Sequence, residues 1–199
     1  MAFLRTSAQP SASELVVDGE GVYARYPTPS DYDDWARVRD ESRSFLTPWE
    51  PTWAPDDLSR PAFRKRLRRY AKDIRDDEAH PFFFFRASDD ALLGGCTFSN
   101  IRRGAAAACS LGYWIGAPYR RRGYTFAAVQ ALIPYVLDAM RLHRVEAACL
   151  PENVASRQLL LKAGFRQEGR ARHYLRINGA WRDHLLFAML RTDLESAAS

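Results

Sequence analysis

The sequence has few cysteines, no long hydrophobic run and no histidine cluster, and each absence excludes a class of protein. Its most conspicuous apolar run, Phe82 to Phe85, is far shorter than the roughly 20 residues that a membrane-spanning helix needs. Cys96, Cys109 and Cys149 are odd in number, far apart and in apolar segments. They predict buried free thiols in a reducing compartment rather than disulfides. The four histidines show no ligand spacing, so we expect no metal site.

A secretion signal and the familiar nucleotide-binding loops are missing as well. The first 13 residues contain no apolar signal core, which argues against secretion and favours the cytoplasm, although their lack of acids leaves a transit peptide as an alternative. No G-x-G-x-x-G motif follows a predicted strand, and the residues after Gly123 lack the lysine of a nucleoside-triphosphate loop. Any phosphate site in this chain must therefore be built in another way.

What is present is the composition of an ordinary globular domain. The 199 residues are 47% hydrophobic, 13% aromatic and 27% charged, with a formal net charge of +5. We expect one domain at residues 21–193, preceded by a loose Ser- and Ala-rich segment at residues 1–20 and followed by a tail at residues 194–199.

Hydrophobic patterning predicts a mixed α/β (α+β) domain of about seven strands and four helices. We expect strands at Val22 to Tyr26, Phe82 to Ala87, Leu92 to Asn100, Cys109 to Ile115 and Val145 to Leu150, and a hairpin around Asn178-Gly179. We expect helices at Asp31 to Phe45, residues 60–75, Tyr124 to Arg141 and Asn153 to Ala163. Pro134 lies inside the third helix and predicts a kink or a shortened helix. The sheet should be mostly antiparallel, with at least one parallel crossover after Cys109.

The stretch from Ser110 to Ala128 reads as a strand, a basic turn, a glycine and a helix. The first turn of a helix carries N–H groups without an intrahelical partner and the positive end of the helix dipole. A phosphate can accept those hydrogen bonds where a glycine lets the backbone approach, and arginines add bidentate donors. Arg120, Arg121, Arg122 and Gly123 therefore form a candidate pyrophosphate site. The alternative is an exposed basic turn before a core helix.

A second basic segment lies between residues 60 and 72, where seven lysines and arginines are interspersed with Phe63, Leu67, Tyr70 and Ile74 at helical spacing. The apolar stripe should face the core and the basic side should face solvent. A solvated helix face explains this pattern. The alternative is docking to an acidic partner such as ribosomal RNA.

Two shorter motifs have both a structural and a functional interpretation. The connection from Phe45 to Pro55 holds three prolines and two tryptophans, which makes a rigid aromatic loop. This loop is either a lid over the core or one wall of a substrate site. Asn153 and Ser156 form N-x-x-S at the head of a helix, where such residues cap the helix and stabilise it by about 1 kcal/mol.

Four blocks of the sequence are similar to the ribosomal-protein alanine N-acetyltransferases, the RimJ/RimL group of the GCN5-related N-acetyltransferase (GNAT) superfamily. The blocks are FLTPWEP at Phe45 to Pro51, FSNIRRG at Phe98 to Gly104, SLGYWIG through YRRRGYTFAA at Ser110 to Ala128, and the tail from PENVAS at Pro151 through LLLKAGF to INGAWRDH at Ile177 to His184. The basic turn resembles the acetyl-CoA loop (Q/R)-x-x-G-x-(G/A) of that superfamily. Arg120, Gly123 and Thr125 fall on its marked positions, and threonine at the last is a departure.

The resemblance implies a GNAT fold over about Val22 to Asp193. It implies transfer of an acetyl group from acetyl-CoA to the α-amine of a protein N-terminus, most typically the N-terminal alanine of a ribosomal protein. The parallel strands would splay, and the pantetheine arm would lie in the gap, bonded to the strand backbone and to Asn153, with Ser156 near the sulfur. The implied strand residues are Tyr113, Trp114 and Ile115. The implied pyrophosphate residues are Arg120, Arg121, Arg122, Gly123, Tyr124 and Thr125.

The catalytic groups are less well marked. Many relatives carry a tyrosine four residues after that serine as the acid that protonates the departing thiolate, but Leu160 occupies this position here. Ser156, directly or through water, is the remaining candidate acid. An α-amine of pKa about 7.7 to 8.0 is partly neutral at pH 7, so it needs positioning and only a modest proton acceptor. Glu50, beside Trp49 in the rigid loop, is the candidate acceptor-site carboxylate. The weaker alternatives, which can pair with nearby arginines, are Glu168 and Asp183.

Three functions stay open on the sequence alone. The first is acetylation of the α-amine of a ribosomal or other protein. The second is acetylation of a small amine such as an amino acid or polyamine, which a narrow, acid-lined acceptor pocket would favour. The third is a ribosome- or RNA-docking assembly factor that uses the basic helix at residues 60–75.

Overall fold

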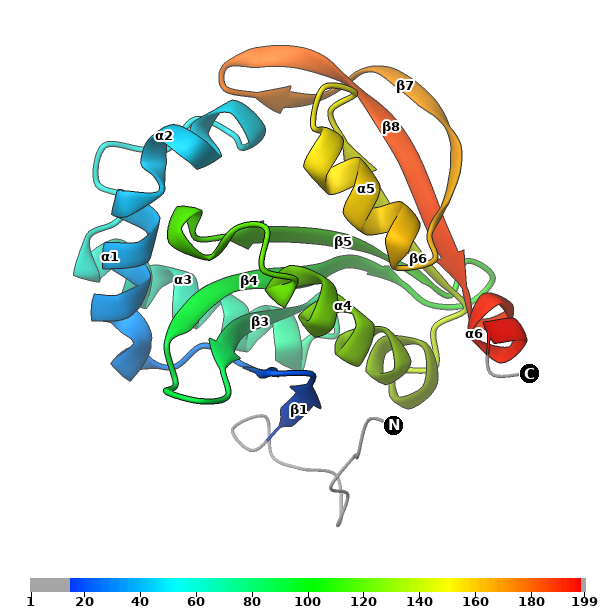
Figure 1. Ribbon diagram of the computed structural model, residues 1–199, viewed down its shortest axis with the longest axis horizontal. Helices are drawn as coiled ribbons and strands as arrows, with labels where there is room; N and C mark the ends of the chain where they lie inside the picture. Colours follow the sequence, from blue (N-terminus) through cyan, green and yellow to red (C-terminus); the bar gives the residue numbers. More distant parts are fainter. Residues whose placement is uncertain (1–14, 198–199) are drawn as a thin grey trace.

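The computed structural model describes residues 15–197 and contains, within that range, one open sheet of eight strands (Figure 1). The strand order is β1-β2-β3-β4-β5-β6-β8-β7, and every neighbouring pair is antiparallel except β5 and β6. The strands are β1 (Val16–Gly19), β2 (Val22–Arg25), β3 (Ala79–Arg86), β4 (Leu92–Arg102), β5 (Ala108–Ile115), β6 (Arg144–Cys149), β7 (Arg166–Ile177) and β8 (Ala180–Leu190). The α-helices are α1 (Tyr32–Glu41), α2 (Arg43–Leu46), α3 (Arg60–Arg75), α4 (Tyr124–Pro134), α5 (Val154–Lys162) and α6 (Arg191–Ala197). This arrangement confirms the predicted fold class.

Helices cover both faces of the sheet, and β3 shows why its sequence is apolar throughout. Successive side chains of a strand point to opposite faces. Phe82 and Phe84 therefore pack in the large core cluster under α4, whereas Phe83 and Phe85 pack with residues of α1 and α3 on the other face. All four phenylalanines are buried. Figure 1 shows α4 in front of the sheet and α3 behind it.

Pro134 shortens its helix, as predicted. Helix α4 ends at Pro134, and the chain continues as one wider turn, Tyr135–Ala139, in which Met140 N donates to Tyr135 O at 3.0 Å. A proline has no N–H and cannot accommodate the carbonyl four residues before it, so the regular hydrogen-bond pattern cannot pass through this position. The turn brings the chain to the start of β6.

The C-terminal hairpin also follows the prediction. Asn178 and Gly179 both have positive φ values, 44° and 80°, which is the backbone conformation of a type I′ turn. The two strands that they connect, β7 and β8, are twelve and eleven residues long. The hairpin extends past α5 to the upper edge of the molecule in Figure 1.

Three boundaries differ from those predicted. Strand β1 lies inside the segment expected to be loose, and α6 includes residues expected to form the tail. The expected helix from Asp31 to Phe45 is divided at Ser42, whose buried hydroxyl accepts a hydrogen bond from Ala117 N at 2.8 Å. Residues 1–14 lie outside the described part of the chain. The first two differences are short elements near the ends of the chain, and the third is an interruption within a helix. Local sequence patterns predict such features least well.

Candidate active site

Strands β5 and β6 pair over only part of their length. Their parallel register joins Ala108–Leu111 to Arg144–Ala147 and then stops, although β5 continues to Ile115 in register with β4. The β5 edge from Gly112 onward therefore has no strand partner on the β6 side. Backbone N–H and C=O groups are obligatory hydrogen-bonding groups, so this edge is available to a bound extended molecule. The splayed pair implied by the resemblance is present.

The basic loop ends at the first turn of α4 with the backbone that an anion site needs. Gly123 precedes the helix with φ 82°, in the left-handed region, and supplies no side-chain cap for the first-turn N–H groups. The side chains of Arg120, Arg121 and Arg122 are exposed, and none of them forms an ion pair within the described range. Arg120 instead lies 5.5 Å above the Phe45 ring. The residues of this loop fit a pyrophosphate group.

Residues of β5 and α5 meet across the gap between the splayed strands. The Tyr113 hydroxyl lies 2.7 Å from Ser156 Oγ and 3.4 Å from the Ser156 carbonyl oxygen. Ser156 N donates to Asn153 Oδ1 at 3.1 Å, so Asn153 caps α5 as the sequence allowed. Leu160 is buried in the main core and offers no proton. The Tyr113–Ser156 contact was not predicted, because Tyr113 was assigned only a backbone role.

The thiols near this gap are poor nucleophiles. Burial raises the pKa of Cys109 to about 12 and raises the pKa of Cys96 well above its usual value. Burial also raises the pKa of Cys149, and a hydrogen bond from Ser156 opposes this shift. All three cysteines are free and buried, as predicted. A protonated thiol attacks a thioester slowly, so direct attack by the acceptor amine needs no cysteine intermediate.

Glu50 lies in the aromatic loop, but its carboxylate is engaged. Arg39 of α1 donates to both Glu50 oxygens, at 2.8 and 2.7 Å, and Trp53 Nε1 donates to Oε2 at 2.7 Å. The Arg39 guanidinium is buried and lies 4.1 Å from the Trp53 ring and 4.9 Å from the Trp114 ring. This cluster holds the loop against β5. This role of Arg39 was not predicted, because nothing in its local sequence distinguishes it from Arg37, the other arginine of α1.

The same loop is joined to the C-terminal hairpin. Asn178 N, in the hairpin turn, donates to the Glu50 carbonyl oxygen at 2.9 Å. Trp49 is half-buried at the end of the short turn Thr47–Trp49 that precedes Glu50. No contact joins Glu50 to Ser156 among the described residues. The structure therefore brings Tyr113 and Ser156 together at the β5–β6 gap. Trp49 and Glu50 lie apart from them, in the aromatic loop.

The two weaker carboxylate candidates are paired with arginines. Arg144 binds Glu168 with two hydrogen bonds and lowers the pKa of that carboxyl. The backbone N–H of His173 and the side chain of Arg170 both donate to Asp183 and lower its pKa. Both groups remain charged at neutral pH and are held by their partners.

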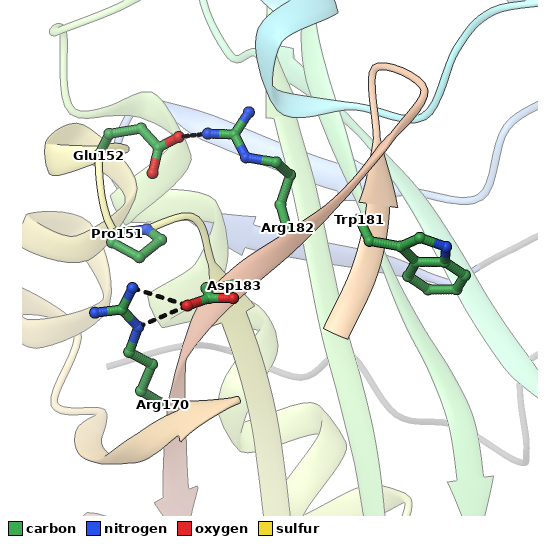
Figure 2. A pocket seen from close by; sticks show the side chains of 6 residues that line it. All are labelled: Pro151, Glu152, Arg170, Trp181, Arg182 and Asp183. Carbon is green, nitrogen blue, oxygen red and sulfur yellow. Dashed lines mark hydrogen bonds and ion pairs between the residues drawn. The ribbon is translucent and has the colours of Figure 1, made fainter. Parts of the chain in front are cut away.

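A cavity of about 250 Å³ opens between the start of α5 and the C-terminal hairpin (Figure 2). Two ion pairs line it side by side, Arg170 with Asp183 and Arg182 with Glu152. The remaining lining residues are Pro151 and Trp181. Since each carboxylate here has an arginine partner, the cavity is not an acid-lined pocket.

No group of three or more His, Cys, Asp or Glu within residues 15–197 could hold a metal ion. In the same range, no helix is both long enough and apolar enough to cross a membrane.

A mixed sheet with one splayed parallel pair, beside a basic loop at a helix N-terminus, is the architecture of acetyl-CoA-dependent N-acetyltransferases. The chain belongs to the acetyltransferase (GNAT) domain family, which it matches over residues 22–166.

Curated relatives and solved structures agree with this assignment. The chain is 37% identical over 166 residues to the ribosomal protein uS5 alanine N-acetyltransferase of Escherichia coli (strain K12), covering 82% of this chain and 85% of that protein. It is 33% identical over 180 residues to the probable N-acetyltransferase YjcK of Bacillus subtilis (strain 168), covering 90% and 99%. RimJ of Mycobacterium smegmatis, solved in complex with CoA-disulfide, has a TM-score of 0.82 and 29% identity, covering 92% of this chain and 93% of that one. The predicted family and enzyme class are confirmed.

Proposed function

We propose that this N-acetyltransferase transfers the acetyl group of acetyl-CoA to the α-amine of a protein N-terminus, and that its acceptor is a ribosomal protein with N-terminal alanine in the cytoplasm. The observation that carries the proposal is the 37% identity to the E. coli enzyme whose name specifies alanine of ribosomal protein uS5. The three buried free thiols are consistent with a reducing compartment.

The geometry supports a binding site for acetyl-CoA that runs from the basic loop into the strand gap. In this proposal the pyrophosphate is held by the arginines and first-turn N–H groups of the loop, which are Arg120, Arg121, Arg122, Gly123, Tyr124 and Thr125. The unpaired β5 edge, from Tyr113 through Trp114 to Ile115, bonds the pantetheine. Asn153 contributes from the start of α5, and Ser156 lies near the sulfur as the candidate acid.

The acceptor side is open and partly apolar, which suits a polypeptide. Trp181, Tyr174 and Leu175 of the C-terminal hairpin are 60%, 48% and 43% exposed. Trp49 and Glu50 belong to the opposing loop, which the hairpin turn contacts at Glu50. Exposed aromatic and apolar side chains that rim a site are characteristic of surfaces that bind a polypeptide.

The engagement of Glu50 changes its proposed role. Protonating this carboxylate would weaken three hydrogen bonds that its negative charge strengthens. Glu50 therefore positions the loop, and solvent takes up the proton that the acceptor ammonium releases. An α-amine tolerates this arrangement because a substantial fraction is already neutral near pH 7.

A small amine is the second candidate acceptor, and the structure supports it less. Such a substrate would need a free carboxylate to bind its ammonium group. Four carboxylates of the loop, the start of α5 and the hairpin have an arginine partner, namely Glu50 with Arg39, Glu152 with Arg182, Glu168 with Arg144 and Asp183 with Arg170.

A third candidate function is binding to the ribosome or ribosomal RNA through the basic residues 60–75. Ion pairs on α3 reduce the positive charge that is available for such binding. Five of its basic residues form ion pairs with aspartates, which are Arg60 with Asp33, Arg66 with Asp57, Arg69 with Asp73, and both Lys72 and Arg75 with Asp76. Arg64, Lys65 and Arg68 are exposed and form no ion pair within the described chain. Any polyanion contact would depend on these three.

The deciding experiment is an acetylation assay read by mass spectrometry. Purified protein and acetyl-CoA are incubated with matched peptides that have a free or a blocked N-terminus and begin with alanine or serine, alongside spermidine and free amino acids. We expect acetylation of free N-termini, fastest for alanine. Labelling of the small amines alone would overturn the proposal. The same assay is run with the Ser156→Ala variant. A rate equal to that of the wild type would show that Ser156 is not the catalytic acid.

A further inference from the structure

The site lacks the tyrosine that many relatives use, and another tyrosine stands close to the same serine. Leu160, at the expected position, is only 1% exposed and packs in the core. Tyr113 approaches from the other side of the gap, on β5, and its hydroxyl lies 2.7 Å from Ser156 Oγ. The phenol of Tyr113 therefore lies beside Ser156, although Tyr113 precedes Ser156 by 43 residues in the sequence.

The strand register explains how Tyr113 reaches α5. Pairing of β5 with β6 stops at Leu111 and Ala147, so Tyr113 lies two residues beyond the last pair. Cys149 of β6 lies two residues beyond the same pair, on the other side of the gap. Tyr113 is half-buried and crosses toward the first turn of α5, where Ser156 lies.

Either hydroxyl can be the donor in the 2.7 Å contact between Tyr113 and Ser156 Oγ. The Ser156 carbonyl can only accept, and the Tyr113 hydroxyl lies 3.4 Å from it. Burial raises the pKa of Tyr113 above its ordinary value, so the phenol keeps its proton at neutral pH and can donate. A serine hydroxyl that accepts from Tyr113 still has its own proton for a third group. Cys149 is one group near enough to be affected, because interaction with Ser156 lowers the pKa of its thiol against the effect of burial.

We propose that Tyr113 is a positioning residue that donates to Ser156 Oγ and thereby directs the Ser156 proton into the β5–β6 gap, toward the sulfur of the departing CoA. This inference rests on the proposed role of Ser156. Acetyl-CoA supplies a thioester whose C–S bond breaks as the C–N bond to the acceptor amine forms, leaving the electron pair on sulfur. Ser156 stabilises the charge on sulfur with its hydrogen bond. The proton that the amine releases returns to the sulfur through solvent and Ser156, so the reaction is balanced.

The test compares Tyr113→Phe, Ser156→Ala and the double variant by steady-state kinetics over pH 6 to 9. General acid catalysis contributes about 10²- to 10⁴-fold, so we expect Tyr113→Phe, which disorders rather than removes the acid, to lower kcat about tenfold. The KM for acetyl-CoA should change by less than about threefold, because only transition-state stabilisation is lost. The double variant should be no slower than Ser156→Ala, because the two residues act as one unit.

Tyr135→Phe is the matched control. It removes another half-buried tyrosine hydroxyl, which interacts with Tyr26 on the far side of the core, and kcat should be unchanged. A wild-type kcat in Tyr113→Phe, or a double variant whose loss equals the product of the single losses, would overturn the proposal. If the wild-type enzyme labels small amines and not peptides, the proposed function fails, and the same three variants are then compared with that amine.

Discussion

Two arginine-rich segments look alike in the sequence and differ in the folded protein. The loop at Arg120–Arg122 presents three guanidiniums without an acidic partner among residues 15–197, beside first-turn N–H groups of α4 that have no side-chain cap. Helix α3 carries more positive charge, but five of its eight basic residues form ion pairs with aspartates of the helix itself or of neighbouring segments. The density of arginine in a sequence is therefore a weaker sign of an anion site than the absence of nearby acids once the chain is folded.

The largest expected effect comes from removing the unpaired arginines. The Arg120→Ala, Arg121→Ala, Arg122→Ala triple variant should raise the KM for acetyl-CoA about 10³-fold, from roughly 1.5 kcal/mol for each lost charge-assisted hydrogen bond. Initial rates at varied acetyl-CoA measure the change, and circular dichroism checks the fold. A change under tenfold would mean that the loop is an ordinary basic turn.

The next effect concerns a buried arginine that has a partner. Arg39→Ala removes one side of the ion pair with Glu50 and should lower the free energy of unfolding by about 3 kcal/mol, measured by urea denaturation. Arg37→Ala is the matched control on the same helix, because its pairs with Asp34 and Glu41 are exposed. Its loss should stay below about 1 kcal/mol. Equal losses would show that burial of the Arg39 pair has no energetic consequence.

A smaller effect, dependent on pH, is expected at a half-exposed pair. Two hydrogen bonds from Arg103 lower the pKa of Asp77, so the pair adds stability above the ordinary carboxyl pKa and loses it as the pH falls through the lowered value. Arg103→Ala should cost about 0.5 to 1 kcal/mol at pH 7 after screening by solvent. The difference from wild type should shrink toward pH 3 in urea denaturation. A pH-independent difference would assign the whole effect to the Arg103 bond with Met140 O.

The smallest effect is expected on α3. The Arg64→Ala, Lys65→Ala, Arg68→Ala triple variant should leave peptide acetylation within about twofold of wild type, because exposed substitutions away from a site change little. Sedimentation with ribosomes at two salt concentrations measures any docking separately. Loss of ribosome association with intact acetylation would show that α3 docks independently of the chemistry, whereas a large loss of peptide acetylation would place α3 in the catalytic site.

Local patterns were sufficient to predict much of the fold. The Asn178-Gly179 turn and the interruption at Pro134 are each determined by the backbone chemistry of one or two residues. The basic loop was visible because strand, glycine and helix follow one another without interruption. Strand β1 and the break at Ser42 were missed, because a four-residue strand and a single serine produce no detectable periodicity.

The side-chain chemistry of the site was harder to predict, since it depends on contacts between distant elements. Tyr113 meets Ser156 only because β5 and β6 diverge after four residue pairs, and no spacing in the sequence reports that divergence. Glu50 was recognised as a carboxylate in a rigid loop, but its partner Arg39 comes from a helix whose face toward the loop is set by packing. Residue types were therefore predictable, and their pairings were not.

The hydrogen bond from Asn178 N to the Glu50 carbonyl has a thermodynamic consequence for acceptor binding. It links the aromatic loop at residues 45–55 to the turn of the C-terminal hairpin, so each of these two surface segments restrains the other. Ordering a mobile loop upon binding typically costs about 0.5 to 1.5 kcal/mol for each side chain that is immobilised. Because the two segments are already linked before the acceptor binds, much of that cost is avoided. A short, flexible polypeptide N-terminus then has to lose only its own conformational freedom when it binds.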